Sequence, residues 1–189
     1  MEWLIPMQTF QVENVQLGIL TNTSKPLIPL AYKDAEHHFP SLSILLPILK
    51  IKSFDASTGH FVISLSENQT TANKLQTLQE MLLKAIIVNS SQWFPRTFKK
   101  PADIRAGYQP LIQGTDLHLY CPIQPQIAQT VPFFNGEWDK TGIQTGLLVP
   151  GSKIRLAIRI QGISFHIHPS SGQWSGKFRL QHKLLAILL

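Results

Sequence analysis

The chain ends in the stretch GSKIRLAIRIQGISFHIHPSSGQWSGKFRLQHKLLAILL, residues 151–189, and this stretch decides which fold we expect. Between residues 153 and 161, aliphatic residues alternate with Lys153, Arg155 and Arg159. Strict alternation places the aliphatic side chains on one face of a β-strand and the cations on the other. The first half of the stretch therefore predicts a strand with an apolar face and a basic face.

The second half of the stretch predicts a partner strand. After a break at Gly162 the alternation resumes and carries His166 and His168 on one face. Pro-Ser-Ser-Gly at 169–172 is a turn signal, and a second alternating run starts near Trp174. The resulting hairpin has these cations: Lys153, Arg155, Arg159, Lys177, Arg179 and Lys183.

The charge of the chain is distributed unevenly. The formal net charge is +6 and the pI is about 9.6. No carboxylate follows Asp139, and every charged side chain from Lys140 onward is a cation. A one-sided distribution of this kind is typical of a surface that binds a polyanion.

Length and composition indicate a folded, β-rich protein. The 189 residues suffice for one domain, which we divide into N-terminal strands at 1–40 and a core at 41–189. Cys121 is the only cysteine, so no internal disulfide forms, as suits a reducing compartment. The N-terminus does not resemble a signal peptide, and the apolar runs are too short for a membrane span. We therefore expect a soluble, intracellular protein.

The middle of the chain predicts a hairpin followed by one main helix. Residues 41–65 read as two β-prone arms around the turn Asp-Ala-Ser-Thr-Gly. Lys50 and Lys52 share one face of the first arm, and they fit either phosphate contacts or an edge strand protected by lysines. Apolar residues at helical spacing predict a helix at 71–88, with Thr71 as its N-cap and Asn89-Ser90-Ser91 as its end. Across 25–40 we expect no continuous regular structure, because prolines recur there.

Two further segments could contact a nucleic acid. A second basic cluster, interleaved with aromatic residues, follows the helix and comprises Arg96, Lys99, Lys100, Arg105 and Tyr108. It fits either single-strand binding or a solvated loop on a basic protein. A long loop at 122–150 carries Phe133, Phe134 and Trp138, which would either face a ligand or pin the loop to the core.

The sequence contains no catalytic constellation that we recognise. The carboxylates are scattered, and no metalloprotease, nucleophile-elbow or phosphate-loop motif is present. His166 and His168 share a strand face, but chelation needs further ligands, so we expect them to extend the basic face. His37 and His38 are expected as solvated loop residues. We predict a non-enzymatic protein without cofactor or metal; a nuclease that uses the hairpin histidines is the alternative.

Three segments in order resemble single-stranded DNA-binding proteins of nucleocytoplasmic large DNA viruses. The first is SSQWFPRTF with IRAGYQPLI, the second is LHLYCP, and the third is the closing hairpin with its Gly-Ile-Ser-Phe motif. Each segment is degenerate alone, and the specificity lies in their order and spacing. The resemblance covers roughly residues 40–189.

The resemblance implies an OB-like β-barrel that binds single-stranded DNA without sequence preference in replication, recombination or repair. By motif match, Trp93 and Phe94 are core anchors, while Arg155, Arg159, Lys177 and Arg179 lie in the family's basic hairpin. A viral protein of this type would act in the host nucleus or at a cytoplasmic replication site, with replication proteins as partners. The chain ends in an aliphatic run at 184–189 and not in an acidic tail, so a sheet edge is the expected contact if it forms a homo-oligomer.

Together these features define our predicted interface and its alternatives. The preference for DNA over RNA stays open. The runner-up is a viral assembly protein with a jelly-roll-like β-sandwich, for which a helix and a basic hairpin are not required. The predicted nucleic-acid-binding residues are Lys50, Lys52, Arg96, Lys99, Lys100, Arg105, Tyr108, Phe133, Phe134, Trp138, Lys153, Arg155, Arg159, His166, His168, Trp174, Lys177, Arg179 and Lys183.

Overall fold

The computed structural model describes residues 3–97, 99–121, 133, 134, 137, 138, 146 and 148–188, with only the backbone at 133, 134, 137, 138 and 188. The described residues form a mainly β structure, as the sequence predicts. Its strands are β1 Ile5–Pro6, β2 Val15–Leu17, β3 Leu27–Lys33, β4 His38–Phe39, β5 Leu42–Asp55, β6 His60–Ser64, β7 Tyr108–Gln109, β8 Ile112–Gln113, β9 Asp116–Tyr120, β10 Phe133–Phe134, β11 Glu137–Trp138, β12 Lys153–Ile167 and β13 Trp174–Leu188. Its helices are η1 Val12–Asn14, α1 Gln69–Trp93 and α2 Pro101–Gly107.

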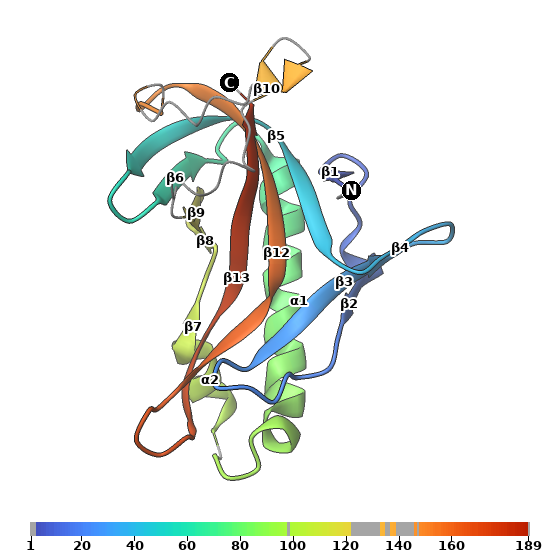
Figure 1. Cartoon of the computed structure of the whole chain (residues 1–189), viewed down its shortest axis with the longest axis vertical. Helices are drawn as coiled ribbons and strands as arrows, with labels where there is room; N and C mark the ends of the chain where they lie inside the picture. The colour runs from blue at the N-terminus through green and yellow to red at the C-terminus, as the bar shows by residue number, and fades with distance from the viewer. Residues whose placement is uncertain are drawn as a thin grey trace.

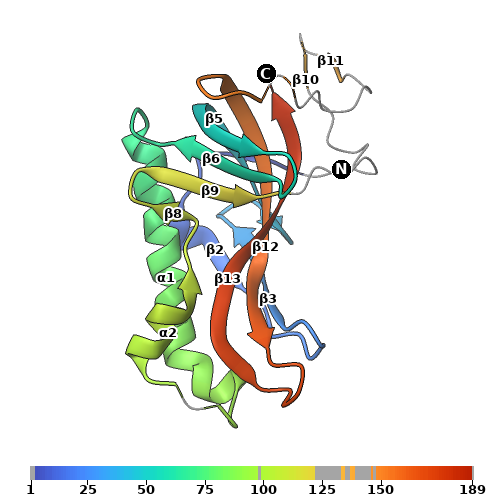
Figure 2. The same cartoon turned by 90° about the vertical axis from the view of Figure 1, so that its left-hand side faces the viewer.

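The strands form one large, mostly antiparallel sheet that curls around α1 (Figures 1 and 2). Its order along the main path is β11-β10-β13-β12-β5-β6-β9-β8, and β3 and β7 join β12 and β13 at the side. Within the described residues, β13 and β9 do not pair as neighbouring strands. The closed barrel that the resemblance implies is therefore not seen, and the structure is an open, curled sheet.

The closing hairpin has the two strands that the alternation predicts. β12 and β13 pair from Arg155 with Leu188 to Ile167 with Trp174, with register shifts at three places. One shift lies at Gly162, where φ is 155° and β3 crosses β12. A Cβ atom there would lie 2.1 Å from the carbonyl oxygen of Ile28, so only glycine lets the two backbones approach this closely.

Helix α1 is longer at both ends than the sequence predicts. The N-cap is Asn68, whose Oδ1 accepts a hydrogen bond from the Thr71 N–H at 3.1 Å, so Thr71 is not the cap. The helix also continues through Asn89, whose side-chain amide donates to the Ala85 carbonyl. It ends where Pro95, which has no N–H, follows Phe94. Packing of the apolar face outweighs the weak helix-breaking tendency of asparagine and serine.

A second helix, α2, lies in the segment that we predicted only as a basic cluster. Pro101 occupies its first turn, and Asp103 accepts a hydrogen bond from the N-cap backbone. The buried Gln79 of α1 holds the chain that follows α2. Its Oε1 accepts hydrogen bonds from the Tyr108 hydroxyl at 3.0 Å and from the backbone N–H groups of Leu111 and Ile112.

The N-terminal 40 residues join the same sheet. β1 pairs with β5, β2 pairs with β3, and β3 pairs with β12. As expected, the segment 25–40 is not one continuous element, since β3 ends at Lys33 and β4 begins at His38, but β3 does run through Pro29. The proline carbonyl still accepts a hydrogen bond from the Gly18 N–H, so the strand loses only one donor.

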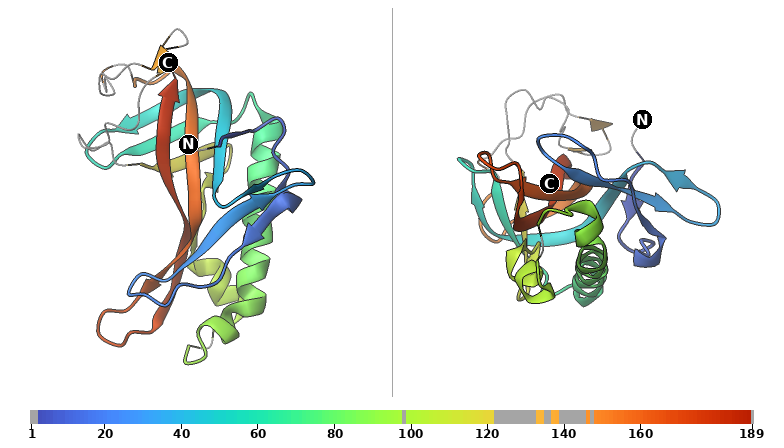
Figure 3. Two further views of the ribbon diagram at one scale, coloured as in Figure 1. Left: turned by 45° about the vertical axis from the view of Figure 1, so that its right-hand side comes forward. Right: turned by 90° about the horizontal axis from the view of Figure 1, so that it is seen from below.

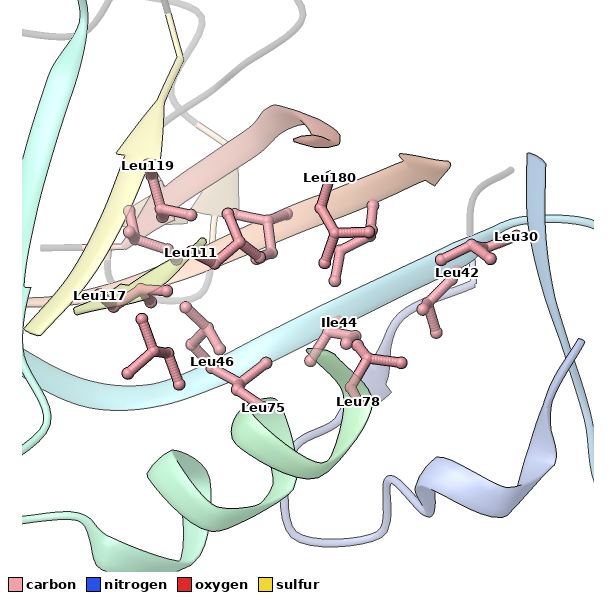
Figure 4. Close-up of a cluster of buried hydrophobic side chains, with 14 of the residues drawn as sticks. Leu30, Leu42, Ile44, Leu46, Leu75, Leu78, Leu111, Leu117, Leu119 and Leu180 are labelled. Carbon is pink, nitrogen blue, oxygen red and sulfur yellow. The ribbon is translucent and has the colours of Figure 1, made fainter. Parts of the chain in front are cut away.

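The core lies between the inner face of the curled sheet and α1. Figure 4 shows Leu75 and Leu78 of α1 against side chains from several strands, among them Leu46, Leu117 and Leu180. The hairpin at 41–65 supplies β5 and β6, as predicted. Neither α1 nor α2 combines the length and apolar character that a membrane-crossing helix requires. Because the core fills one face of the sheet, the opposite face is left for polar side chains.

Candidate nucleic-acid interface

Four strands lie side by side at the lower part of the closing hairpin (Figure 1). In order these strands are β7, β13, β12 and β3. Four residues are in register across these strands. Gln109 lies beside Arg179, Arg179 beside Ser164, and Ser164 beside Leu27. The strand pairing thus brings together side chains that are far apart in sequence.

An open groove of about 870 Å³, which we call the basic groove, is lined mainly by β7, β12 and β13 and by the loop before β3. Its cations and imidazoles are Lys25, His166, Lys177, Arg179 and His182, and its aromatic rings are Tyr108, Tyr120, Phe165 and Phe178. None of the described residues that line the groove is an aspartate or a glutamate. Cations without neighbouring carboxylates create a positive potential that attracts an anionic ligand.

The cations of the groove differ from other cations of the chain in their partners. Within the described residues, Lys25, Lys177 and Arg179 form no ion pair. By contrast, Lys50 and Lys52 have carboxylate partners, Glu67 and Asp116, at 2.5 and 2.8 Å, and Arg105 lies 3.8 Å from Glu80. Phosphate groups can therefore reach these groove cations without displacing a protein carboxylate.

The two imidazoles of the groove have different environments. His166 is exposed, and its Nδ1 lies 3.0 Å from the Ser175 hydroxyl. His182 is half-buried, and burial lowers the pKa of its imidazole below the usual value, an effect that Arg179 reinforces. His182 therefore stays neutral near pH 7, while the exposed ring of His166 already has a polar partner in Ser175.

Two tyrosines form the aromatic part of the groove. The Tyr108 ring stacks on Phe178 with centroids 5.1 Å apart, and burial raises the pKa of its hydroxyl. The Tyr120 ring stacks on His60 at 4.3 Å with an interplanar angle of 2°. Both rings are half-buried, so each has a packed side and an accessible part in the groove.

The structure gathers only part of the predicted interface in this groove. His166, Lys177, Arg179 and Tyr108 line it, whereas His168 lies just beyond it. Lys183 and Arg159 face each other in register farther along the hairpin. Lys153 pairs in register with Lys50, near the N-terminal end of α1, and phosphate contact by Lys50 and Lys52 stays a prediction.

Other predicted residues lie away from the groove. The Arg155 guanidinium donates to the Leu46 carbonyl at 3.0 Å. Arg96 and Lys100 are exposed between the two helices, and the Lys99 side chain lies against Gly176 of β13. The side chains of Phe133, Phe134 and Trp138 lie outside the described residues; their backbone forms β10 and β11 beside the end of β13.

Trp174 was predicted as a ring that stacks on bases, and the structure corrects this. Its side chain is 1% exposed and packs against Phe94, Phe165 and Phe178. Its indole N–H donates to the Lys177 carbonyl. The alternation that starts at Trp174 is real, but the even-numbered residues face the core, so Trp174 belongs to the apolar face. Trp93 and Phe94 pack against the core, as the resemblance implies.

Sequence reasoning missed Lys25, Tyr120 and His182. Lys25 lies in a proline-rich segment and comes near His166 only because β3 pairs with β12. Tyr120 and His182 meet at the open side of the sheet, where the Tyr120 N–H donates to Nε2 of His182 at 2.8 Å. The alternation of β9 indicated that Tyr120 faces outward, but no local signal shows which strand it meets.

No cluster of three or more potential metal ligands occurs in the part of the chain that the structure describes. The rings of His166 and His168 are 6.0 Å apart and nearly perpendicular. Comparison of the chain with protein-family models, with curated proteins and with solved structures finds no match.

Proposed function

We propose that this protein binds single-stranded DNA without sequence preference and that the basic groove holds the phosphates. The observation that carries the proposal is the groove itself, which brings Lys25 of the loop before β3 beside Lys177 and Arg179 of β13 and whose described lining residues include no carboxylate. A built-in set of unpaired cations suits a ligand with regularly repeated negative charge. The resemblance noted in the sequence supports single-stranded DNA as that ligand, with roles in replication, recombination or repair.

The physical basis of binding would be counterion release. Lys25, Lys177 and Arg179 replace cations that are condensed on the phosphates, and the released cations drive association. The affinity should therefore fall steeply as the salt concentration rises. An open, curled sheet leaves the groove accessible, as a flexible strand requires.

The aromatic side chains of the groove favour a single strand over a duplex. Unpaired bases can leave their neighbours and stack on a protein ring, which contributes about 1–3 kcal/mol per base. Tyr120 and Tyr108 offer such rings beside the cations. The bases of a duplex are already paired and stacked, so a duplex would use only the electrostatic part of the site.

Fluorescence anisotropy with a labelled oligothymidine tests the proposal. We expect tight binding that weakens with salt, and much weaker binding of a duplex of the same length. Equal affinity for both forms would overturn the proposal. A labelled oligouridine in the same assay measures the preference for DNA over RNA.

Two other functions predict different results. A capsid-like assembly protein would form large symmetric particles without DNA, which size-exclusion chromatography with light scattering detects. A nuclease would shorten the oligonucleotide in the presence of Mg²⁺ or Mn²⁺. We expect neither result, because the described residues hold no cluster of three or more potential metal ligands and the groove residues form no acid–base pair.

A further inference from the structure

A second hollow continues the basic groove at the lower end of the molecule. There the loop before β3, the turn of the closing hairpin and the C-terminal end of α1 come together (Figure 3, left). The hollow has a volume of about 700 Å³, and Ser24 and Ile167 line both it and the groove. A ligand that leaves the groove past Ile167 therefore enters the hollow directly.

The chemistry of the hollow differs from that of the groove. Its apolar surface comes from Trp93 and Phe94, both half-buried, with Leu20 and Pro26 nearby. One part of each ring packs on the Phe165 side of the core, at centroid distances of 6.2 and 4.9 Å. Because both residues also line the hollow, the rest of each ring is accessible there.

The rim of the hollow offers hydrogen bonds but little charge. Asn22 and His168 lie on it, and within the described residues neither side chain has a hydrogen-bond partner. None of the described residues that line the hollow is a lysine, an arginine or a carboxylate. Accessible rings with a polar rim of this kind suit a flat, uncharged group that carries donors and acceptors, which describes a nucleobase and not a phosphate.

We infer that the hollow is a base-binding subsite, in which an unpaired base of the bound strand stacks on Trp93. The base would belong to the same strand whose phosphates lie in the basic groove, so the inference rests on the proposed function. Trp93 then has two roles, since one part of its ring anchors the core and the other contacts the ligand. Because the basic groove and the hollow differ in chemistry, the bound strand also has a defined course, from the phosphate-binding groove into the base-binding hollow.

Photo-crosslinking tests the subsite in the unmodified protein. An oligothymidine with 5-bromouracil at single positions is bound and irradiated, and the crosslinked peptide is identified by mass spectrometry. We expect adducts on the peptides that contain Trp93 and His168. This measurement does not depend on a variant that must fold.

A substitution gives the energetic part of the test. Trp93→Leu should weaken oligothymidine binding about tenfold, because one stacked base is lost. The dependence of affinity on salt should stay unchanged, since no phosphate contact is removed. Trp3→Leu is the matched control. Trp3 is 64% exposed and lines neither the basic groove nor the hollow, so this variant should bind like the wild type.

The outcomes separate the two proposals. If the wild type binds oligothymidine, crosslinks elsewhere and loses nothing on Trp93→Leu, the subsite is wrong and the proposed function stands. If the wild type does not bind oligothymidine, the proposed function fails and the subsite fails with it. Should Trp93→Leu not fold, His168→Ala with Asn22→Ala replaces it, because both residues are exposed.

Discussion

Tyr120 and His182 are joined across the side of the sheet that stays open. The Tyr120 N–H donates to Nε2 of His182 at 2.8 Å, and Nδ1 of the same ring donates to the Leu180 carbonyl at 2.9 Å. One nitrogen must accept and the other must donate, so the ring has to be neutral. Among the described residues, a neutral imidazole thus links β9 to β13, which do not pair with each other as strands.

This link predicts that the protein loses stability in mild acid. Burial lowers the pKa of His182, and burial together with His60 lowers that of His118, so both bind a proton more readily in the unfolded chain. Their contribution to the free energy of unfolding is complete above the unfolded value of 6.5 and is lost as the pH falls below it. Urea unfolding across this range should show the decline, and His182→Asn should reduce its slope.

The histidines affect the free energy of unfolding in a different pH range from the carboxylates. Asp34, Asp55 and Glu67 have pKa values that hydrogen bonds hold below their usual 3.8 or 4.5, so they affect stability only in stronger acid. A free energy of unfolding that stays constant or rises when the pH falls from neutrality to about one unit below 6.5 would contradict the prediction.

The second prediction concerns the cations of the groove. Lys177→Gln with Arg179→Gln should weaken oligothymidine binding at least about tenfold at low salt and reduce the slope of log K against log salt by about 1.4. The control pair, Lys33→Gln with Lys84→Gln, removes the same charge from exposed positions outside the groove. If both pairs change the affinity and the slope equally, net charge and not the groove governs binding.

The third prediction tests the position of Trp174. Trp174→Phe keeps an aromatic ring in the cluster with Phe165 and Phe178, so oligothymidine affinity should stay within about twofold of the wild type. Trp174→Ala should lower the free energy of unfolding by about 3–5 kcal/mol, since it empties a buried site. A large loss of affinity in a stable Trp174→Phe variant would place the ring in the interface after all.

The fourth prediction concerns the crossing of β3 and β12. Gly162→Ala should destabilise the fold by at least about 3 kcal/mol, because its Cβ would collide with backbone atoms of Ile28 and its φ is strained for alanine. Gly172→Ala also has positive φ but meets open space, so it should cost only about 1 kcal/mol. Thermal unfolding distinguishes them, and similar effects would argue against the backbone contact.

Much of the local structure was predictable because it depends on neighbours in sequence. Alternation in 151–189 predicted β12 and β13, and helical spacing predicted the central part of α1. The errors lie where tertiary packing outweighs local preference. α1 continues through Asn89 because its face packs on the sheet, and β3 runs through Pro29 because both of its neighbours pair with it.

The candidate site was predictable only in part for the same reason. The basic face of the hairpin supplied Lys177, Arg179 and His166, but the groove also needs Lys25 from the loop before β3 and Tyr120 from β9. These residues are separated from the hairpin by long stretches of chain. The sequence shows which residues these are, but no local pattern shows which strands lie beside them in the fold.

By itself, the sequence determined that this protein has a mainly β fold, a basic hairpin and one long amphipathic helix. It did so because period and charge are properties of short segments. Only the tertiary structure decided that the sheet stays open, that Trp174 is buried, and that Trp93 lines a hollow next to the groove. Strand order and register bring distant side chains together, and they depend on the packing of the whole chain.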